Sequence, residues 1–530
     1  MRTFRVPRIN YPPRYVSAAA IASTGGILNG LDTGVIGPVT TMKSFTDEFG
    51  HPSPAIHGMI VSSILLSMAF ASLFAGSLSD NLGRTRAIAL GALLFAIGAT
   101  VEAGASILGL FIFGRLIAGI GQGFFLSTLV VYICEISPAK HRGLLASLIQ
   151  FFITSGLVVG YFACYGTVRV QSSFSWRFPI ALQSGIALFL TALFLFYLPE
   201  SPRWLHHHGH RAAAEAVCAR LGISIIESDA ETEGEGHPYD RSNVEELSTF
   251  SARLRHHYER NVHNLRLILG PGARKQALLG VFLMSMQQLS GIDGVIYYAP
   301  LLFKQAGLSS STASFLASGV SAILICLASI PAFLYADKIG RRASALYGGS
   351  MLAAIMALIG SLYASNSVHP VSGAGRWVVI VSIYLFSITY SMTWALGLKI
   401  YSSEIQSVST RATVTSIAQS ANCMTNFFVA YITPTLLNAS SFGMYFLFCG
   451  CIVITVVIGA LFMPETRGQP LESIAEAFSH HSARSTTLMR LLLRFVAFIR
   501  GFSERHAYRH GASTTTTTAT VVRGPGTPEL

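Results

Sequence analysis

Three polar side chains, Gln287, Gln288 and Asp293, interrupt an apolar stretch at residues 277–303. An amide group both donates and accepts hydrogen bonds, so two consecutive glutamines suit a ligand whose hydroxyl groups do the same. Glycines among these residues let a helix loosen and free backbone groups for a ligand. The pattern predicts a site for a polyhydroxylated ligand; amides that only join neighbouring helices are the alternative.

Two ionisable residues, Asp32 and Arg115, lie in two other apolar stretches. A lone ion at the centre of a bilayer costs roughly 2.5–3.5 kcal/mol on insertion scales, and pairing reduces that cost. An acid beside an arginine that can approach and leave is also suited to taking up and releasing a proton. We therefore expect the two residues to pair and to form a candidate proton site.

The composition indicates the kind of element that must hold these residues. Hydrophobic residues make up 51% of the 530 and charged residues 12%, whereas a soluble domain has about 25% charged residues. The net charge of +12 could indicate nucleic acid, but the basic residues lie in short clusters between apolar stretches, as the positive-inside rule produces. We expect an all-α membrane protein without a nucleic-acid partner. No metal-ligand spacing or nucleophile–base pair is present, so we expect no metal, no cofactor and no enzymatic activity.

Twelve apolar stretches are long enough to cross a bilayer, which takes about 20 residues. They are expected near 16–37, 56–78, 87–105, 110–134, 146–168, 178–198, 277–303, 312–336, 343–364, 376–398, 412–437 and 441–463. The expected parts are an N-terminal segment 1–15, a six-helix bundle 16–205, a central loop 206–275 with short helices, a second bundle 276–465 and a tail 466–530. Within the tail, 488–502 fits a helix lying on the membrane surface, and the rest is expected to be disordered.

Basic residues concentrate in the loops on one side of the predicted bilayer. These are the N-terminal segment, the loops after spans 2, 4 and 8, and the central loop. Both termini and the central loop are therefore expected to be cytoplasmic, and the plasma membrane is the expected location.

Two charged motifs recur at matching places in the two sets of spans. Asp-x-x-Gly-Arg follows spans 2 and 8, and Tyr-x-x-Glu, with Arg seven residues beyond the Glu, follows spans 4 and 10. Their charged members are Asp80, Arg84, Glu135, Arg142, Asp337, Arg341, Glu404 and Arg411. The recurrence indicates two duplicated halves, which is typical of secondary transporters with a midplane site. These charges could latch the halves together in one state; ordinary topology charge is the alternative.

Five short motifs in this order resemble the sugar porter family of the major facilitator superfamily, in particular its fungal-type monosaccharide transporters. They are GLDTGVIG, GRLIAGIGQG, PESPRWL, QQLSGIDGVIYYAP and PETRG. The resemblance covers roughly residues 25–475. It implies twelve transmembrane helices in two pseudo-symmetric six-helix bundles, working as a monomer.

The resemblance also implies roles for individual residues. It places the main contacts to a hexose or pentose on Gln287 and Gln288, with further contacts from Gln150 and Asn426. Tyr297 and Tyr298 help to close the outer gate. Asp32 with Arg115 implies proton symport, although some facilitators of the same family keep this Asp. An uncoupled facilitator and a sugar receptor that does not transport therefore stay open.

The chain departs from the family pattern at three positions. Lys399 and Cys423 stand where the family usually has Trp, and Asp293 stands where many members have Asn. Trp394 could partly replace a lost Trp or only face lipid. We hypothesise that Asp293 and Lys399 pair, or that Lys399 admits a substrate with a carboxylate, such as a sugar acid, or a related polyol. The alternative is that Lys399 reaches the cytoplasmic surface.

Overall fold

The computed structural model describes residues 13–223, 270, 274–308, 311–335, 340–369, 373–406 and 411–466. Asp337, the remainder of the central loop and the tail, including the predicted surface helix at 488–502, lie outside these ranges. All regular elements of the described residues are helices. The chain is therefore an all-α protein, as its composition predicts.

The first half consists of the helices α1 to α8, followed by two short helices of the central loop. The bounds in the half are α1 Arg14–Ser23, α2 Gly26–Thr41, α3 Lys43–Phe49, α4 Pro54–Leu82, α5 Arg84–Ala103, α6 Leu108–Ile136, α7 Ala139–Thr167 and α8 Phe174–Tyr197. The two loop helices are α9 Pro202–His207 and α10 Arg211–Leu221. Helix α10 begins in the predicted loop 206–275, where the family resemblance places short helices, whereas α9 begins at Pro202, four residues before that loop.

The second half repeats this arrangement, with a broken first span. Its bounds are α13 Arg274–Gln288, α14 Ile292–Tyr297, α15 Ala299–Gln305, α16 Ser311–Leu334, α17 Arg341–Ala364, α18 Gly375–Glu404, α19 Arg411–Ala439 and α20 Gly443–Phe462. The break falls at Gly291, whose φ of 83° lies in the left-handed region. Glycine adopts this conformation without the strain that a Cβ would add, so the span carrying Gln287 and Gln288 is interrupted directly after them.

Ten helical segments of the described residues are long and apolar enough to cross a membrane. Two expected spans fall outside this group for different reasons. The span expected at 16–37 is divided into α1 and α2, neither of which reaches 18 residues. The span expected at 412–437 is α19, which has 29 residues but carries amide and hydroxyl side chains along its length. Both spans pack along other helices, α2 along α7 and α19 along α4, so their polar groups can find protein partners instead of lipid.

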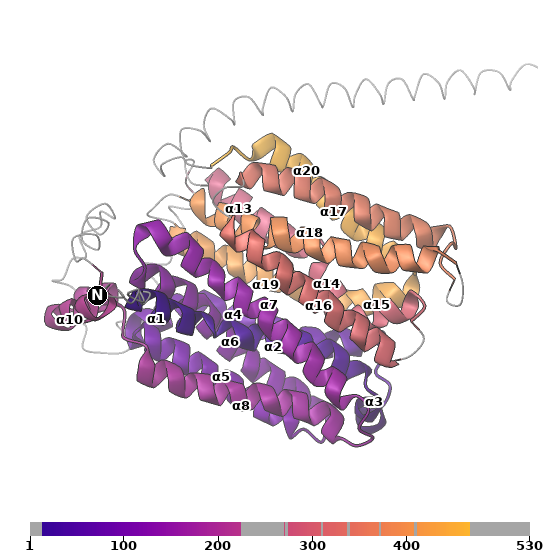
Figure 1. The fold of residues 1–530 in the computed structure, drawn as a ribbon, viewed down its shortest axis with the longest axis horizontal. Coiled ribbons are helices and arrows are strands. Elements are labelled where there is room, and N and C mark those ends of the chain that lie inside the picture. The colour runs from indigo at the N-terminus through magenta and orange to yellow at the C-terminus, as the bar shows by residue number, and fades with distance from the viewer. Residues whose placement is uncertain are drawn as a thin grey trace, which may run out of the picture.

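The two halves lie side by side, coloured indigo to magenta and orange to yellow in Figure 1. Two long contacts join them, one between α4 and α19 and the other between α7 and α16. Each contact pairs the second span of one half with the fifth span of the other, which is the symmetry expected of duplicated halves. Helices α14 and α15 of the second half also contact α2 of the first half, so α2, α7, α14 and α19 all lie at the interface between the halves.

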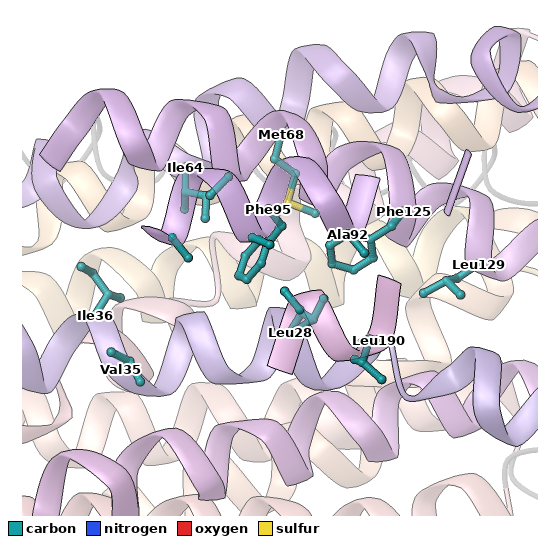
Figure 2. Close-up of a cluster of buried hydrophobic side chains, with 14 of the residues drawn as sticks. Leu28, Val35, Ile36, Ile64, Met68, Ala92, Phe95, Phe125, Leu129 and Leu190 are labelled. Atoms are coloured by element: carbon teal, nitrogen blue, oxygen red, sulfur yellow. The ribbon is translucent and has the colours of Figure 1, made fainter. Parts of the chain in front are cut away.

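The core of the first half is a cluster of fully buried apolar side chains. Figure 2 shows Leu28 from α2, Ile64 and Met68 from α4, Phe95 from α5 and Phe125 from α6 packed together. The outer faces are apolar as well, since Phe196 is 89% exposed and Tyr347 is 80% exposed. Exposed aromatic surface of this extent is unusual for a soluble monomer and fits helices that face lipid. The chain is an integral, multi-pass membrane protein.

Candidate substrate and proton sites

Asp32 on α2 and Arg115 on α6 form a buried ion pair in the first half. The two guanidinium nitrogens of Arg115 lie 3.1 and 3.4 Å from the two carboxylate oxygens of Asp32. Arg115 also donates a hydrogen bond of 3.0 Å to the carbonyl oxygen of Val61 on α4. The exposed fractions are 3% for Asp32 and 1% for Arg115. The structure thus brings together the two ions that the sequence predicts to pair.

Glu102 on α5 is a third member of this cluster, and the sequence did not single it out. Its carboxylate lies 3.5 Å from the Arg115 guanidinium, and its side chain is 3% exposed. Gly114 makes room for it, because a Cβ at that position would come within 2.8 Å of the Glu102 side chain. One arginine therefore forms ion pairs with two buried carboxylates. When all three groups are ionised, the cluster carries one uncompensated negative charge, which is costly away from water.

Gln287 and Gln288 lie at the end of α13 and are bound differently. Gln287 donates to the carbonyl oxygen of Trp394 at 2.8 Å and accepts from the amide of Asn422 at 3.2 Å. Gln288 donates to the side-chain oxygen of Asn422 at 3.0 Å, while its own side-chain oxygen has no partner among the described residues. Gln287 thus joins three helices, as the helix-to-helix alternative requires, and Gln288 keeps a free acceptor.

Two further amides predicted to contact the ligand also have unused hydrogen-bonding capacity. The side-chain oxygen of Asn426 on α19 is buried and makes no hydrogen bond within the described ranges. Gln150 on α7 is half-buried, and no side-chain hydrogen bond joins it to another described residue. Buried polar atoms without a partner are uncommon in native structures. Together with Gln288, these amides are available to a ligand.

Asp293 and Lys399 face each other across α14 and α18. The two side chains interact electrostatically, and Asn426 lies close to the Asp293 carboxylate. In the described part of the chain, however, no ion pair within 4.0 Å joins Asp293 to Lys399. Lys399 also lies near Cys423 on α19. The three positions at which the chain departs from the family pattern are therefore neighbours in space.

Tyr297 and Tyr298 lie where the second half contacts α2 and α4 of the first half. Both are buried, and the Tyr298 hydroxyl donates to the carbonyl oxygen of Ala430 at 2.7 Å. Gly37 on α2 touches the Tyr297 carbonyl so closely that no Cβ would fit between them. The ring of His57 on α4 packs edge-on against Tyr298, with ring centroids 5.4 Å apart. No pattern in the sequence points to this contact. The halves are therefore in close contact at the tyrosine end.

The repeated charges gather at the opposite end of the first half. Arg84 pairs with Asp80 at 2.6 Å and with Glu135 at 3.0 Å. Glu200, which follows α8, accepts hydrogen bonds from the backbone nitrogens of Arg84 and Thr85 at 2.8 and 3.3 Å. A carboxylate there stabilises the start of α5, because the first amides of a helix lack partners within the helix.

The second half repeats this arrangement with its own residues. Arg341 pairs with Glu404 at 3.2 Å, and Glu465, after α20, accepts from the Arg341 backbone nitrogen at 2.9 Å. Arg411 donates to the carbonyl oxygen of Gln406 at 3.2 Å, and Arg142 is half-buried near the start of α7. The pairs described for Arg84 and Arg341 lie within one half, so the latch between halves stays a prediction. We call the Glu200 and Glu465 carboxylates, at the starts of α5 and α17, the caps. The sequence signal that could have revealed them is Pro-Glu-Ser at 199–201 and Pro-Glu-Thr at 464–466.

Known proteins share both the sequence pattern and the fold of this chain. The model of the family described as "Sugar (and other) transporter" matches residues 18–478. The chain is 29% identical to the sugar transport protein MST3 of Oryza sativa subsp. japonica, over 87% of this chain and 90% of that protein. It is 28% identical to the high-affinity glucose transporter 1 of Candida albicans, over 86% and 84%. The solved structure of XylE, described as a proton:xylose symporter, matches with a TM-score of 0.70 and 25% identity, over 88% of this chain and 99% of XylE; a related structure gives its source as E. coli.

Proposed function

The chain belongs to the sugar transporter family of the major facilitator superfamily, and on this premise we propose that it carries a monosaccharide, a hexose or pentose, by proton symport. The observation that carries the coupling is the Arg115 guanidinium, held between the buried carboxylates of Asp32 and Glu102. A buried cluster with one excess negative charge is suited to taking up one proton, because protonation removes a charge that is costly away from water.

The sugar site in this proposal lies between the halves. Gln150 belongs to α7 of the first half, whereas Gln288 and Asn426 belong to α13 and α19 of the second. Their unused hydrogen-bonding groups match the donors and acceptors of sugar hydroxyls. A site shared by the halves becomes accessible from one side or the other as the halves rock, which is the principle of alternating access.

Helix α2 offers a route by which the proton site can act on the gate. Asp32 and Gly37 lie on this helix, and Gly37 contacts the Tyr297 backbone. When Asp32 is protonated, its attraction to Arg115 weakens, and α2 is freer to move relative to α6. Such a movement changes the contact at Tyr297, close to Asp293 on the same short helix α14. Proton uptake and gate opening are coupled in this way.

The remaining expectations are part of the same proposal. We place the protein in the plasma membrane as a monomer, with both termini, the central loop and the ends carrying Arg84 and Arg341 in the cytoplasm. The positive-inside rule supports this orientation. The tyrosine end then faces outward, and its closed state here corresponds to a closed outer gate.

The test is uptake of labelled glucose, galactose and xylose by cells that lack their own hexose carriers. We expect accumulation that a protonophore abolishes. In Asp32→Asn, we expect accumulation to be lost while exchange of internal for external sugar continues, because exchange needs no net proton movement. Uptake that ignores the protonophore would identify a facilitator. Binding without transport of any hexose, pentose or sugar acid would identify a receptor.

A further inference from the structure

Lys399 is a cation for which the described residues of the second half offer no hydrogen-bond acceptor. Its side chain is half-buried on α18, and no hydrogen bond or ion pair within 4.0 Å connects it to another described residue. An ammonium group has three N–H donors and no acceptor. Leaving such a group unpaired at membrane depth is costly, so its retention there calls for a ligand or a role that uses the charge.

The surroundings of Lys399 show that the charge points inward. Its electrostatic neighbours are Asp293 on α14 and Cys423 on α19, and these three helices contact one another. A lysine reaching the aqueous surface would not lie beside two interior side chains of different helices. The interpretation in which Lys399 extends to the cytoplasmic surface is therefore the less consistent one.

The space around Lys399 is not filled by a nearby indole. Trp394 is fully buried, and its ring nitrogen donates to the carbonyl oxygen of Ala345 on α17 at 3.0 Å. It therefore packs into the second half against α17 and does not face lipid. At positions 399 and 423, a flexible cation and a small thiol stand where two large rings are usual in the family.

Asp293 does not remove the need for an anion at Lys399. The carboxylate lies close to Asn426 and is separated from the ammonium by more than ion-pair distance. A carboxylate accepts hydrogen bonds from hydroxyl groups, whereas an ammonium binds a carboxylate more strongly than a hydroxyl. The two charges thus present one acceptor for hydroxyl groups and one donor for an acid, on neighbouring helices.

From these observations we propose that the substrate is a sugar acid, a polyhydroxylated ring or chain with one carboxylate. The carboxylate binds the Lys399 ammonium, and the hydroxyl groups bind Asp293, Gln288 and Asn426. This inference rests on the proposed transport function and narrows its substrate class. It also assigns Lys399 as the residue that selects acids over neutral sugars.

The test compares two ligands that differ in one group. D-Galacturonate carries a carboxylate at the position where D-galactose carries a hydroxymethyl group. Binding of each to the purified full-length protein is measured by calorimetry, beside Lys399→Met, Lys399→Arg and the matched control Lys304→Met. Lys304 is exposed on α15 and is not among the residues of the proposed site.

We expect the wild-type protein to bind galacturonate more tightly than galactose. Lys399→Met should weaken galacturonate binding about 10- to 100-fold, the range of a charge-assisted hydrogen bond, and leave galactose binding within about twofold. Lys399→Arg and Lys304→Met should keep the preference for the acid. Thermal unfolding of each variant without ligand shows whether the protein is folded.

Three results would overturn the inference. If the wild type prefers galactose and Lys399→Met is unchanged, the sugar-transport proposal survives and the acid-selecting role fails. If Lys399→Met loses both ligands while folded, Lys399 maintains the site instead of selecting the acid. If the wild type binds neither galacturonate, gluconate, galactose nor glucose, the proposed function fails together with the inference.

Discussion

Gln288 donates a hydrogen bond to the side-chain oxygen of Asn422 at 3.0 Å, and its own side-chain oxygen then has no partner in the described part of the chain. Asn422 also donates to Gln287 and to the carbonyl oxygen of Met284 at 2.7 Å. The asparagine thus sets the orientation of both glutamines. One of them is committed to joining helices, and the other is oriented with a free acceptor.

This difference predicts opposite outcomes for two neighbouring substitutions. Gln288→Ala should weaken sugar binding about tenfold, because it removes a group available to the ligand, with little change in the melting temperature. Gln287→Ala should lower the melting temperature instead, because it leaves Asn422 and the Trp394 carbonyl without their partner. Calorimetric binding and thermal unfolding of both variants check this. Equal effects on both measurements would contradict the assignment.

Glu102→Gln should change the pH dependence of transport without abolishing it. With Glu102 neutral, the cluster of Asp32, Glu102 and Arg115 no longer carries an excess negative charge, so less is gained by taking up a proton and transport requires more acid. We expect the pH of half-maximal uptake to fall by about one unit. Initial uptake rates from pH 4 to 8 measure the shift. The exposed Glu215 on α10 provides the control Glu215→Gln, which should keep the wild-type pH profile. If the pH profile of Glu102→Gln is the same as that of wild type, Glu102 has no part in the coupling.

Glu200→Gln should destabilise the start of α5. The neutral amide can still accept a hydrogen bond from the Arg84 backbone, but it loses the favourable charge at the helix N-terminus. We expect a loss of about 1 kcal/mol, seen as a lower melting temperature in detergent. Glu465→Gln should behave in the same way at α17, since it occupies the equivalent position. A melting temperature equal to that of wild type in both variants would show that the charge is dispensable.

Gly37→Ala should disturb the closed tyrosine end. Its Cβ would collide with the Tyr297 carbonyl, whereas a Cβ at Gly166 on α7 would meet no heavy atom within 4 Å. We expect Gly37→Ala to favour the state in which α2 and α14 are apart and to slow uptake at least about tenfold. Gly166→Ala should transport normally. Cysteine labelling at Thr33→Cys by a membrane-impermeant reagent reports the opening, and unchanged labelling in Gly37→Ala would contradict it.

The sequence allows much of the fold to be predicted, because crossing a bilayer leaves a strong apolar signal. The two-halved helical architecture and the break beside Gly291 follow from apolar stretches, repeated motifs and glycine. The division of the first span into α1 and α2 does not, because both pieces are apolar and no proline separates them. The family resemblance placed Gln287 and Gln288 together, but their unequal bonding depends on backbone carbonyls of α18 that no side-chain pattern reports.

For the ionic sites, too, the sequence shows which residues are unusual but not all of their partners. Asp32 and Arg115 stand out because each is a lone charge in an apolar stretch. Glu102 lies near the end of such a stretch, where a charge usually marks a boundary, and only the packing of α5 against α6 brings it to Arg115. Similarly, Glu200 and Glu465 belong to visible motifs, but their role requires knowing that each sixth span ends beside the start of the third.

The caps at Glu200 and Glu465 have a mechanical consequence. Each one fastens the end of the last span in a half to the beginning of its third span, so each bundle is closed upon itself. A bundle closed in this way can turn as a rigid body. In the proposed transport cycle we expect rotation to be concentrated along the two long contacts, α4 against α19 and α7 against α16, which would then act as the pivot. A bulky side chain in these contacts would stiffen the motion without touching either the sugar or the proton.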